Sequence, residues 1–129
     1  MLYLARELSK LGVRPSAALG FGTAAECCFE REFRELCSDL RVFTQDGSRG
    51  ERGLVTQALS GNYSFVYACG PLPMLRAVDE KSAAPGQFSL EARMGCGFGA
   101  CMGCTVETKN GPRRVCRDGP VFGLGEVRW

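Results

Sequence analysis

Residues 95–116 read GCGFGACMGCTVETKNGPRRVC, and this stretch decides how the last third of the chain folds. Its cysteines are Cys96, Cys101, Cys104 and Cys116, in the spacing C-x4-C-x2-C-x11-C. That is the ligand spacing of a plant-type 2Fe-2S centre with a shortened last interval. Glycines alternate with the first three cysteines, so the backbone can bend tightly and turn N–H groups toward anionic sulfurs. The stretch therefore predicts a loop that supplies three thiolates to a two-iron cluster.

A predicted β-hairpin places the fourth cysteine. The segments TVET and RRVC flank an Asn-Gly turn signal, which is typical of two short antiparallel strands. Pairing Thr108 with Arg113 would set Cys116 opposite Thr105. Directly opposed residues have Cβ atoms ~5 Å apart, so we expect Cys116 to lie beside Cys104. The proline after the turn signal has no N–H to close a strict two-residue turn, so we expect a slightly longer loop with this register kept.

Two other roles for these cysteines stay open on the residues alone. A structural zinc site also takes four cysteines, but it usually builds them from two C-x2-C pairs, and only Cys101 and Cys104 have that spacing. Disulfides are the second alternative, because the chain holds eight cysteines. No signal peptide opens the sequence, and a reduced chain favours metal or redox roles for such a cluster. We therefore expect a cytoplasmic protein.

The composition is that of an ordinary globular protein, and it excludes several kinds of site. Hydrophobic residues make up 45% of the chain and charged residues 23%, and the formal net charge is +2. That balance carries no electrostatic sign of nucleic-acid binding, and no apolar run approaches the ~20 residues of a membrane span. Histidine is absent. A Rieske centre, a histidine-zinc hydrolase site and a Ser-His-Asp triad are therefore excluded.

Residues 1–86 alternate between helical and strand patterns. Strands that alternate with helices imply parallel pairing, so this segment predicts a partial doubly wound α/β sheet. We expect a domain boundary after residue 86, with a small β-rich cluster domain at 87–129. The expected strands are 16–21, 40–46 and 63–70, and the expected helices are 2–12, 26–36, 53–60 and 73–83.

Two loops of this sheet are candidates for ligand binding, because ligands bind beyond the carboxyl ends of parallel strands. The loop TQDGSRGERG can offer backbone N–H groups and a helix N-terminus to an anionic or ribosyl ligand, and a plain surface turn is the alternative. The candidate residues are Asp46, Gly47 and Gly50 in this loop and Cys69, Gly70 and Pro71 after the third strand. A G-x-G-x-x-A match at 20–25 is either a dinucleotide fingerprint or a glycine-rich turn without a ligand.

Four segments taken together resemble one family: TQDGSRGERGLVT, YACGPLPML, GCGFGACMGCTV and RVCRDGPVF. In this order they are similar to the electron-transfer subunit of B-type dihydroorotate dehydrogenase, in the ferredoxin-NADP reductase superfamily. The resemblance covers essentially the whole chain. The cysteine spacing followed by DGPVF is its most specific part, whereas DGSxGxxG and CGPxPM are shared across the wider superfamily.

The resemblance implies an electron relay. In that family NADH delivers hydride to an FAD held by the subunit. Single electrons then pass through the 2Fe-2S centre to the FMN of a separate catalytic subunit, which interconverts dihydroorotate and orotate in pyrimidine biosynthesis. The implied iron ligands are Cys96, Cys101, Cys104 and Cys116. The resemblance also implies that Asp46, Gly47 and Gly50 face the pyridine nucleotide and that Cys69, Gly70 and Pro71 lie near the nicotinamide and flavin.

The sequence also departs from the family pattern. Relatives begin with an antiparallel β-barrel that holds FAD, followed by a first strand and a glycine-rich loop, whereas this sequence starts in what resembles the next helix. We therefore expect a nucleotide-binding domain without its first strand, which holds FAD weakly or not at all and is not active alone. Gly22 stands where relatives often have an arginine. Two other functions remain: an iron-sulfur subunit of another NAD(P)H-dependent flavin reductase complex, and a non-enzymatic, zinc-stabilised binding module.

Overall fold

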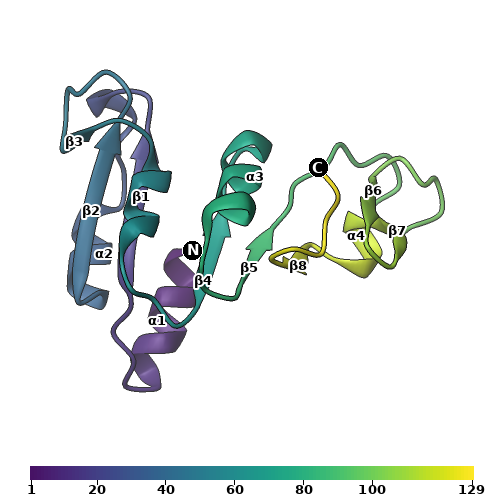
Figure 1. Ribbon diagram of the computed structural model, residues 1–129, viewed down its shortest axis with the longest axis horizontal. Helices are drawn as coiled ribbons and strands as arrows, with labels where there is room; N and C mark the ends of the chain where they lie inside the picture. Colours follow the sequence, from purple (N-terminus) through teal and green to yellow (C-terminus); the bar gives the residue numbers. More distant parts are fainter. The chain divides into compact units, whose positions relative to one another are not determined.

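The computed structural model describes residues 1–129, and the chain forms two compact units, Met1–Ser60 and Gly61–Trp129. Both units are mixed α/β structures that contain helices and strands (Figure 1). The α/β class predicted from the sequence is confirmed. No helix combines the length and the apolar character that a membrane crossing requires.

The first unit is built on a three-stranded parallel sheet in the order β1-β2-β3. Its longest pairing joins β1 and β2 in parallel, from Ser16 beside Asp39 to Phe21 beside Thr44. The predicted parallel pairing of the first two strands is therefore confirmed. The elements are α1 (Leu2–Lys10), β1 (Ser16–Phe21), a 3-10 helix η1 (Ala24–Glu26), α2 (Glu30–Leu36), β2 (Asp39–Thr44), β3 (Glu51–Arg52) and a second 3-10 helix η2 (Val55–Ser60).

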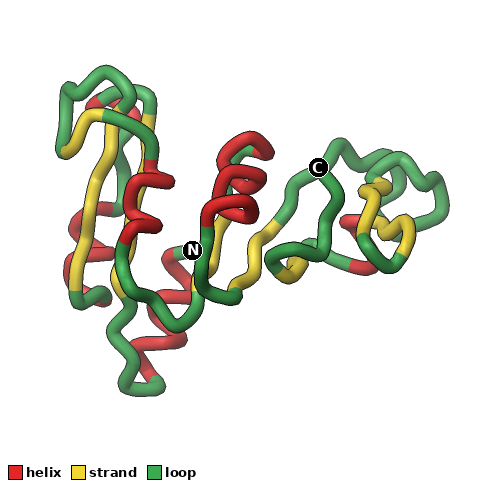
Figure 2. The backbone as a smooth tube through the Cα atoms, in the orientation of Figure 1, coloured by secondary structure: helices red, strands yellow, loops and turns green.

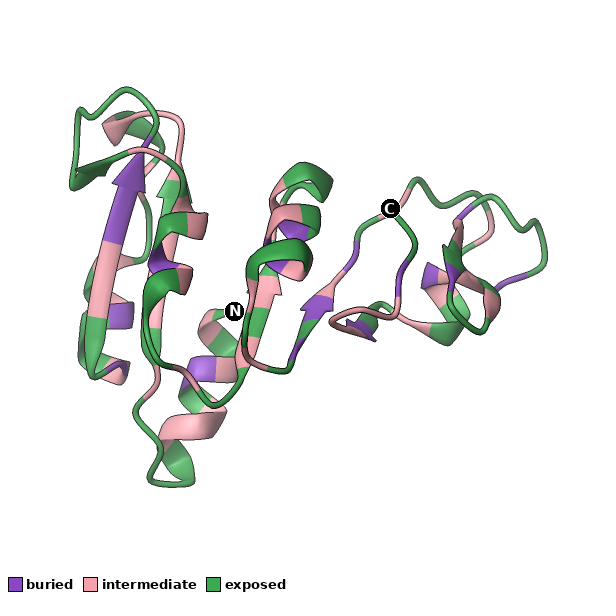
Figure 3. Ribbon diagram, viewed as in Figure 1, coloured by how far each residue is buried: buried purple, intermediate pink, exposed green.

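An apolar core holds this unit together. Buried side chains of α1 and of the end of α2 meet there, namely Ala5, Phe33 and Cys37, with leucines of the helices and strands packed against them. The carboxyl end of β2 is the most buried part of the sheet, since Phe43 and Thr44 are fully inaccessible to solvent (Figure 3). Burying a phenylalanine side chain of this kind contributes roughly 2–3 kcal/mol to folding.

The second unit contains a three-stranded sheet in the order β4-β5-β8 and a separate hairpin of β6 and β7. Strands β4 and β5 pair in parallel, and β8 runs antiparallel to β5. Residues 90–104 connect β5 to the hairpin without any helix or strand (Figure 2). The elements are β4 (Val66–Cys69), α3 (Leu72–Lys81), β5 (Gly86–Ser89), β6 (Thr105–Thr108), β7 (Gly111–Arg114), α4 (Val115–Asp118) and β8 (Val121–Gly123).

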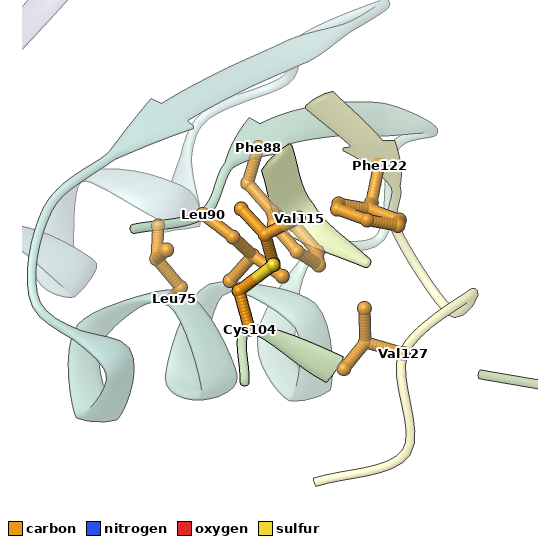
Figure 4. Close-up of a cluster of buried hydrophobic side chains, with 7 residues drawn as sticks. All are labelled: Leu75, Phe88, Leu90, Cys104, Val115, Phe122 and Val127. Carbon is orange, nitrogen blue, oxygen red and sulfur yellow. The ribbon is translucent and has the colours of Figure 1, made fainter. Parts of the chain in front are cut away.

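One hydrophobic core joins the sheet and the hairpin of this unit. Its buried members come from α3, β5, the hairpin region and the C-terminal segment, and Figure 4 shows them gathered round one centre. They are Leu75, Phe88, Leu90, Cys104, Val115, Phe122 and Val127. One of the four motif cysteines, Cys104, is thus a core residue with only 3% of its surface exposed.

The boundary between the two compact units lies at a different residue from the domain boundary expected from the sequence. The expected boundary after residue 86 falls at the start of β5, which pairs with β4 on one side and with β8 on the other. This pairing joins β4 and α3 to the cluster region. The two compact units therefore separate after residue 60. Strand β5 itself went unpredicted, because GQFS is short and has no β-branched residue. The functional division at residue 86 stays a prediction.

Two predicted helices differ from the observed ones. The helix expected at 53–60 is the 3-10 helix η2. Helix 26–36 is interrupted, because Cys27 is extended and Phe29 has a left-handed backbone with φ of 60° before α2 begins. Gly20 explains how closely η2 packs on β1, since a Cβ there would lie 2.8 Å from Val55 Cβ.

Candidate functional site

The first two motif cysteines lie together in the irregular loop 95–103. The backbone N–H of Cys101 donates to Cys96 Sγ at 3.4 Å, and that of Gly103 donates to Cys101 Sγ at 3.5 Å. The loop turns this sharply because Gly97 and Gly99 have φ angles of 74° and 94°, in the region that favours glycine. The glycines between the cysteines therefore do what the sequence indicated and turn amide N–H groups toward sulfur.

The other two motif cysteines form a second pair. Cys104 Sγ and Cys116 Sγ are 3.2 Å apart, and the N–H of Cys116 donates to Cys104 Sγ at 3.5 Å. A backbone hydrogen bond of 3.1 Å from Val115 N–H to the Cys104 carbonyl holds the two segments in register. Cys116 therefore lies beside Cys104, as the hairpin argument predicted.

The predicted hairpin register was wrong, although it led to the right neighbour. Thr108 pairs with Gly111, not with Arg113, and Thr105 pairs with Arg114. The loop is a strict two-residue turn, because Thr108 pairs directly with Gly111, and the Thr108 hydroxyl also donates to the Gly111 carbonyl at 2.6 Å. Pro112 lies opposite Glu107, and its missing N–H costs no stability at this position. Cys116 lies beyond the hairpin, in the short helix α4, which bends the chain back toward Cys104.

Hydrogen bonds to sulfur favour the thiolate form at two of these positions. The backbone N–H groups of Cys101 and Phe98 lower the pKa of Cys96 to about 6. The N–H of Cys116 lowers the pKa of Cys104. The hydrogen bond that the Cys116 thiol makes with Cys104 raises the pKa of Cys116, and burial adds to this effect. Each of the two pairs thus contains one sulfur prepared to carry negative charge.

The donor set fits a two-iron cluster. The four cysteines stand as two linked pairs: Cys101 N–H donates to Cys96 Sγ, and the sulfurs of Cys104 and Cys116 lie 3.2 Å apart. A 2Fe-2S core takes two thiolates on each iron, so it needs two pairs held side by side. A single zinc ion needs four thiolates at one centre. The N–H groups directed at the sulfurs suit an anionic cluster.

The first candidate nucleotide loop lies at the carboxyl end of β2, as expected from the sequence. Asp46 Oδ1 accepts hydrogen bonds from both the N–H and the hydroxyl of Ser48, at 2.9 and 2.6 Å. These bonds lower the pKa of the Asp46 carboxyl. The Ser48 hydroxyl in turn accepts a 2.7 Å bond from Ala24 N–H. This joins the loop to the turn after β1.

Two glycines allow this loop its shape. Gly47 and Gly50 have φ angles of 77° and 65°. At Gly50 a Cβ atom would lie 2.1 Å from the Val42 carbonyl oxygen, so no other residue fits there without moving the backbone.

The second candidate loop follows β4 in the other unit. Cys69 is the exposed last residue of the strand, and Pro71 is the N-cap of α3. A shallow pocket at this point is lined by Gly70, Pro71, Leu72 and Glu91. The two candidate loops thus belong to different units, and the binding roles predicted for their residues stay predictions.

Three further residues help to shape these sites. Glu26 accepts a 2.9 Å bond from Gly22 N–H and occupies the turn that was considered as a dinucleotide fingerprint. Glu91 lines the pocket beside Gly70 and follows β5, the strand that went unpredicted. Arg114 donates from Nη1 to the Gly99 carbonyl in the cluster loop at 2.8 Å. Of the three, the sequence points only to Arg114, which with Arg113 and Arg117 is either a counter-charge to an anionic cluster or a solvated surface residue.

Known proteins match this chain in sequence and in structure. Residues 91–128 match the iron-sulfur cluster binding domain of dihydroorotate dehydrogenase B. The dihydroorotate dehydrogenase B (NAD(+)) electron transfer subunit of Shouchella clausii is 41% identical over 98% of this chain, and that of Bacillus caldolyticus is 45% identical over 96%. The chain spans about half the length of these relatives, 52% and 51% respectively.

The fold has a solved counterpart as well. A chain of the NADH-dependent reduced ferredoxin-NADP oxidoreductase superimposes with a TM-score of 0.84 and 30% sequence identity. The match covers 98% of this chain and 48% of that one. Sequence and structure agree: over about half of their length the chain is similar to dihydroorotate dehydrogenase B electron transfer subunits, and its fold is like that of a ferredoxin-NADP oxidoreductase.

Proposed function

We propose that Cys96, Cys101, Cys104 and Cys116 hold a 2Fe-2S cluster, with one sulfur pair on each iron. The observation that supports this most directly is the 3.2 Å approach of Cys104 Sγ to Cys116 Sγ, beside the loop in which Cys101 N–H reaches Cys96 Sγ. When bound, such a cluster accepts and releases one electron at a time. The residues of this chain position the thiolates, supply N–H groups to them and shield Cys104 from water.

We further propose that the chain is part of an electron-transfer subunit. In the proposed activity, electrons move from NADH through FAD and the cluster to the FMN of a dihydroorotate dehydrogenase catalytic subunit, in a hetero-oligomer. Identity of more than 40% with subunits of that name supports this assignment. We also propose a cytoplasmic location, because a cluster held by reduced cysteine thiolates suits a reducing compartment.

The nucleotide contacts belong to the same proposal. The exposed loop with Asp46, Gly47 and Gly50 would meet the pyridine nucleotide, and Cys69, Gly70 and Pro71 would lie near the nicotinamide and flavin. Supporting this, both loops follow the carboxyl ends of parallel strands, where ligands of such sheets bind. The Asp46 carboxylate is held in place by Ser48.

One observation favours a second candidate function. The solved structure that matches this fold comes from an NADH-dependent reduced ferredoxin-NADP oxidoreductase. An iron-sulfur subunit of such a flavin reductase complex would use the same cluster and the same nucleotide loops with another electron acceptor. Electron transfer to the dihydroorotate dehydrogenase catalytic subunit, compared with transfer to a ferredoxin, discriminates the two.

Anaerobic purification of the 129-residue chain tests the proposal. We expect two iron and two sulfide ions per chain, the visible spectrum of a 2Fe-2S protein and no stoichiometric zinc. A colourless protein with one zinc ion would instead show a structural metal site. Flavin should be absent or substoichiometric. Retained FAD whose absorbance bleaches with NADH would contradict the expectation that this chain alone holds it weakly.

A further inference from the structure

Arg114 makes four contacts that tie the hairpin to the cluster loop. Its Nη1 donates to the Gly99 carbonyl at 2.8 Å and lies 3.9 Å from Met102 Sδ. Its Nε donates to Asp118 Oδ2 at 3.3 Å, and its backbone N–H donates to the same oxygen at 2.8 Å. Asp118 in α4 thus holds one side of the guanidinium. The other side binds the loop through the Gly99 carbonyl.

Gly99, whose carbonyl accepts the hydrogen bond from Arg114, is a buried residue. Its neighbours Phe98 and Ala100 are exposed. A buried carbonyl needs a hydrogen-bond partner, and the bond from Arg114 supplies it. Since the side chain of Arg114 is only 23% exposed, this charge-assisted bond is partly shielded from water.

The hydrogen bond from Arg114 to the Gly99 carbonyl also fixes the orientation of the peptide group between Gly99 and Ala100. The Gly99 carbonyl and the Ala100 N–H belong to one planar trans peptide and point in opposite directions. With the carbonyl held by Arg114, the Ala100 N–H is turned to the opposite side of the peptide. The same loop segment ends at Cys101, whose N–H donates to Cys96 Sγ at 3.4 Å. The Gly99 peptide therefore sets the course of the backbone between Cys96 and Cys101.

We propose that Arg114 is a positioning residue for the cluster, because it fixes the Gly99 peptide in the loop that joins Cys96 to Cys101. Asp118 anchors Arg114 from the other side. The inference rests on the proposed cluster site and assigns the orientation of its loop to one side chain. Residues that orient metal ligands in this way typically change metal affinity by 10–100-fold when they are replaced.

The main test replaces Arg114 and measures how fast the full chain loses its cluster to an iron chelator. Arg114→Met should lose the cluster about tenfold faster than the wild type. Its midpoint potential should also fall, since N–H groups and positive charge near sulfur stabilise the reduced form. Arg114→Lys keeps the charge but cannot reach Gly99 and Asp118 together as the guanidinium fork does. It should therefore resemble Arg114→Met in the rate of cluster loss.

Arg117 provides the matched control. Its Cδ would lie 2.9 Å from a Cβ on Gly99, so it places a similar charge near the same loop residue, but it donates no hydrogen bond to the loop. Arg117→Met should keep a loss rate close to that of the wild type. Equal rates for Arg114→Met and Arg117→Met, or full rescue by Arg114→Lys, would overturn the proposal, because charge alone would then explain the effect.

A second measurement needs no cluster. In the metal-free chain, amide hydrogen exchange of residues 97–101 should be faster in Arg114→Met than in Arg117→Met, and Asp118→Asn should fall between them. Unchanged exchange in Arg114→Met would contradict the positioning role. If the wild type binds no iron and sulfide, the proposed function fails. The hydrogen-exchange measurement still tests whether Arg114 holds the loop in place.

Discussion

At the scale of single residues, two kinds of position carry the site. The cysteines supply the sulfur atoms, and a few glycines permit backbone shapes that other residues resist. Both kinds were visible in the sequence as residue types at a spacing. How much stability is lost when one of these glycines is replaced depends on neighbours that only the structure shows. At Gly50 that neighbour is the Val42 carbonyl oxygen.

Replacing Cys116 should abolish or greatly destabilise the cluster. Cys116→Ser removes one of the two sulfurs of the second pair, which lie 3.2 Å apart, and would leave one iron of the proposed cluster with a single cysteine thiolate. Iron and sulfide counts after anaerobic purification measure the effect. Cys27→Ser and Cys28→Ser are the controls, since both residues lie in the first unit. Equal cluster loss in all three variants would mean that the ligand set is wrong.

Gly50→Ala should destabilise the first unit more than an ordinary glycine replacement does. Gly50 and Gly12 have similar φ angles of 65° and 78°, but a Cβ on Gly12 would meet nothing within 4 Å. Gly12→Ala should therefore cost about 1 kcal/mol from backbone conformation alone. Gly50→Ala adds a clash with a backbone carbonyl and should cost several-fold more. Urea unfolding of both variants measures the difference, and equal costs would contradict the argument.

At the scale of elements, short polar contacts set the shape of the loops that follow the strands. The loop after β2 curls because the buried Thr44 hydroxyl donates to the Arg49 carbonyl at 2.7 Å and accepts from the Arg49 N–H at 3.1 Å. The Arg49 side chain continues to α2, where its Nε donates to Glu30 Oε1 at 2.5 Å. Strand and helix are thus joined through one arginine. The sequence predicted both elements but not this connection, because hydrogen bonds across 19 residues leave no local pattern.

Glu30→Gln should remove a pH-dependent part of the stability. The hydrogen bond from Arg49 lowers the pKa of Glu30 from its ordinary 4.5. A folded-state pKa below the unfolded value stabilises the protein above pH 4.5, and this stability is lost as the pH falls through the folded pKa. The difference in unfolding free energy between wild type and variant should therefore be present at neutral pH and vanish in acid. A difference independent of pH would contradict the ion-pair explanation.

At the scale of the molecule, each unit is closed by contacts between segments far apart in sequence. In the second unit, Trp129 Nε1 donates to Asp79 Oδ2 at 2.7 Å, and the N–H of Gly125 donates to the other oxygen of this carboxylate. The Trp129 ring lies 5.5 Å from the ring of Phe88 between centroids. Val127 forms a β-bridge with Thr108 on the open edge of the hairpin. These contacts join α3 to the hairpin that carries Cys104.

Asp79→Ala should weaken the second unit and its hold on the cluster. The substitution leaves two hydrogen-bond donors without their acceptor, which costs about 1–3 kcal/mol where they are shielded from water. Thermal unfolding and the rate of cluster loss measure the effect. Glu80→Ala is the matched control on the same helix, because Glu80 makes only an exposed ion pair with Arg76. Similar losses in both variants would show that the carboxylate of Asp79 has no special role.

The sequence by itself determined the α/β class, the first parallel strands and the four candidate sulfur ligands, since all of these follow from local patterns. The sequence also predicted Cys116 beside Cys104, but only the tertiary structure decided the hairpin register and the turn of α4 that brings the two sulfurs together. It also decided that β5 joins the cluster region to β4, and that Arg114 holds the loop at Gly99. The physical reason is the same in each case: long-range hydrogen bonds and burial act between residues that no local pattern brings together.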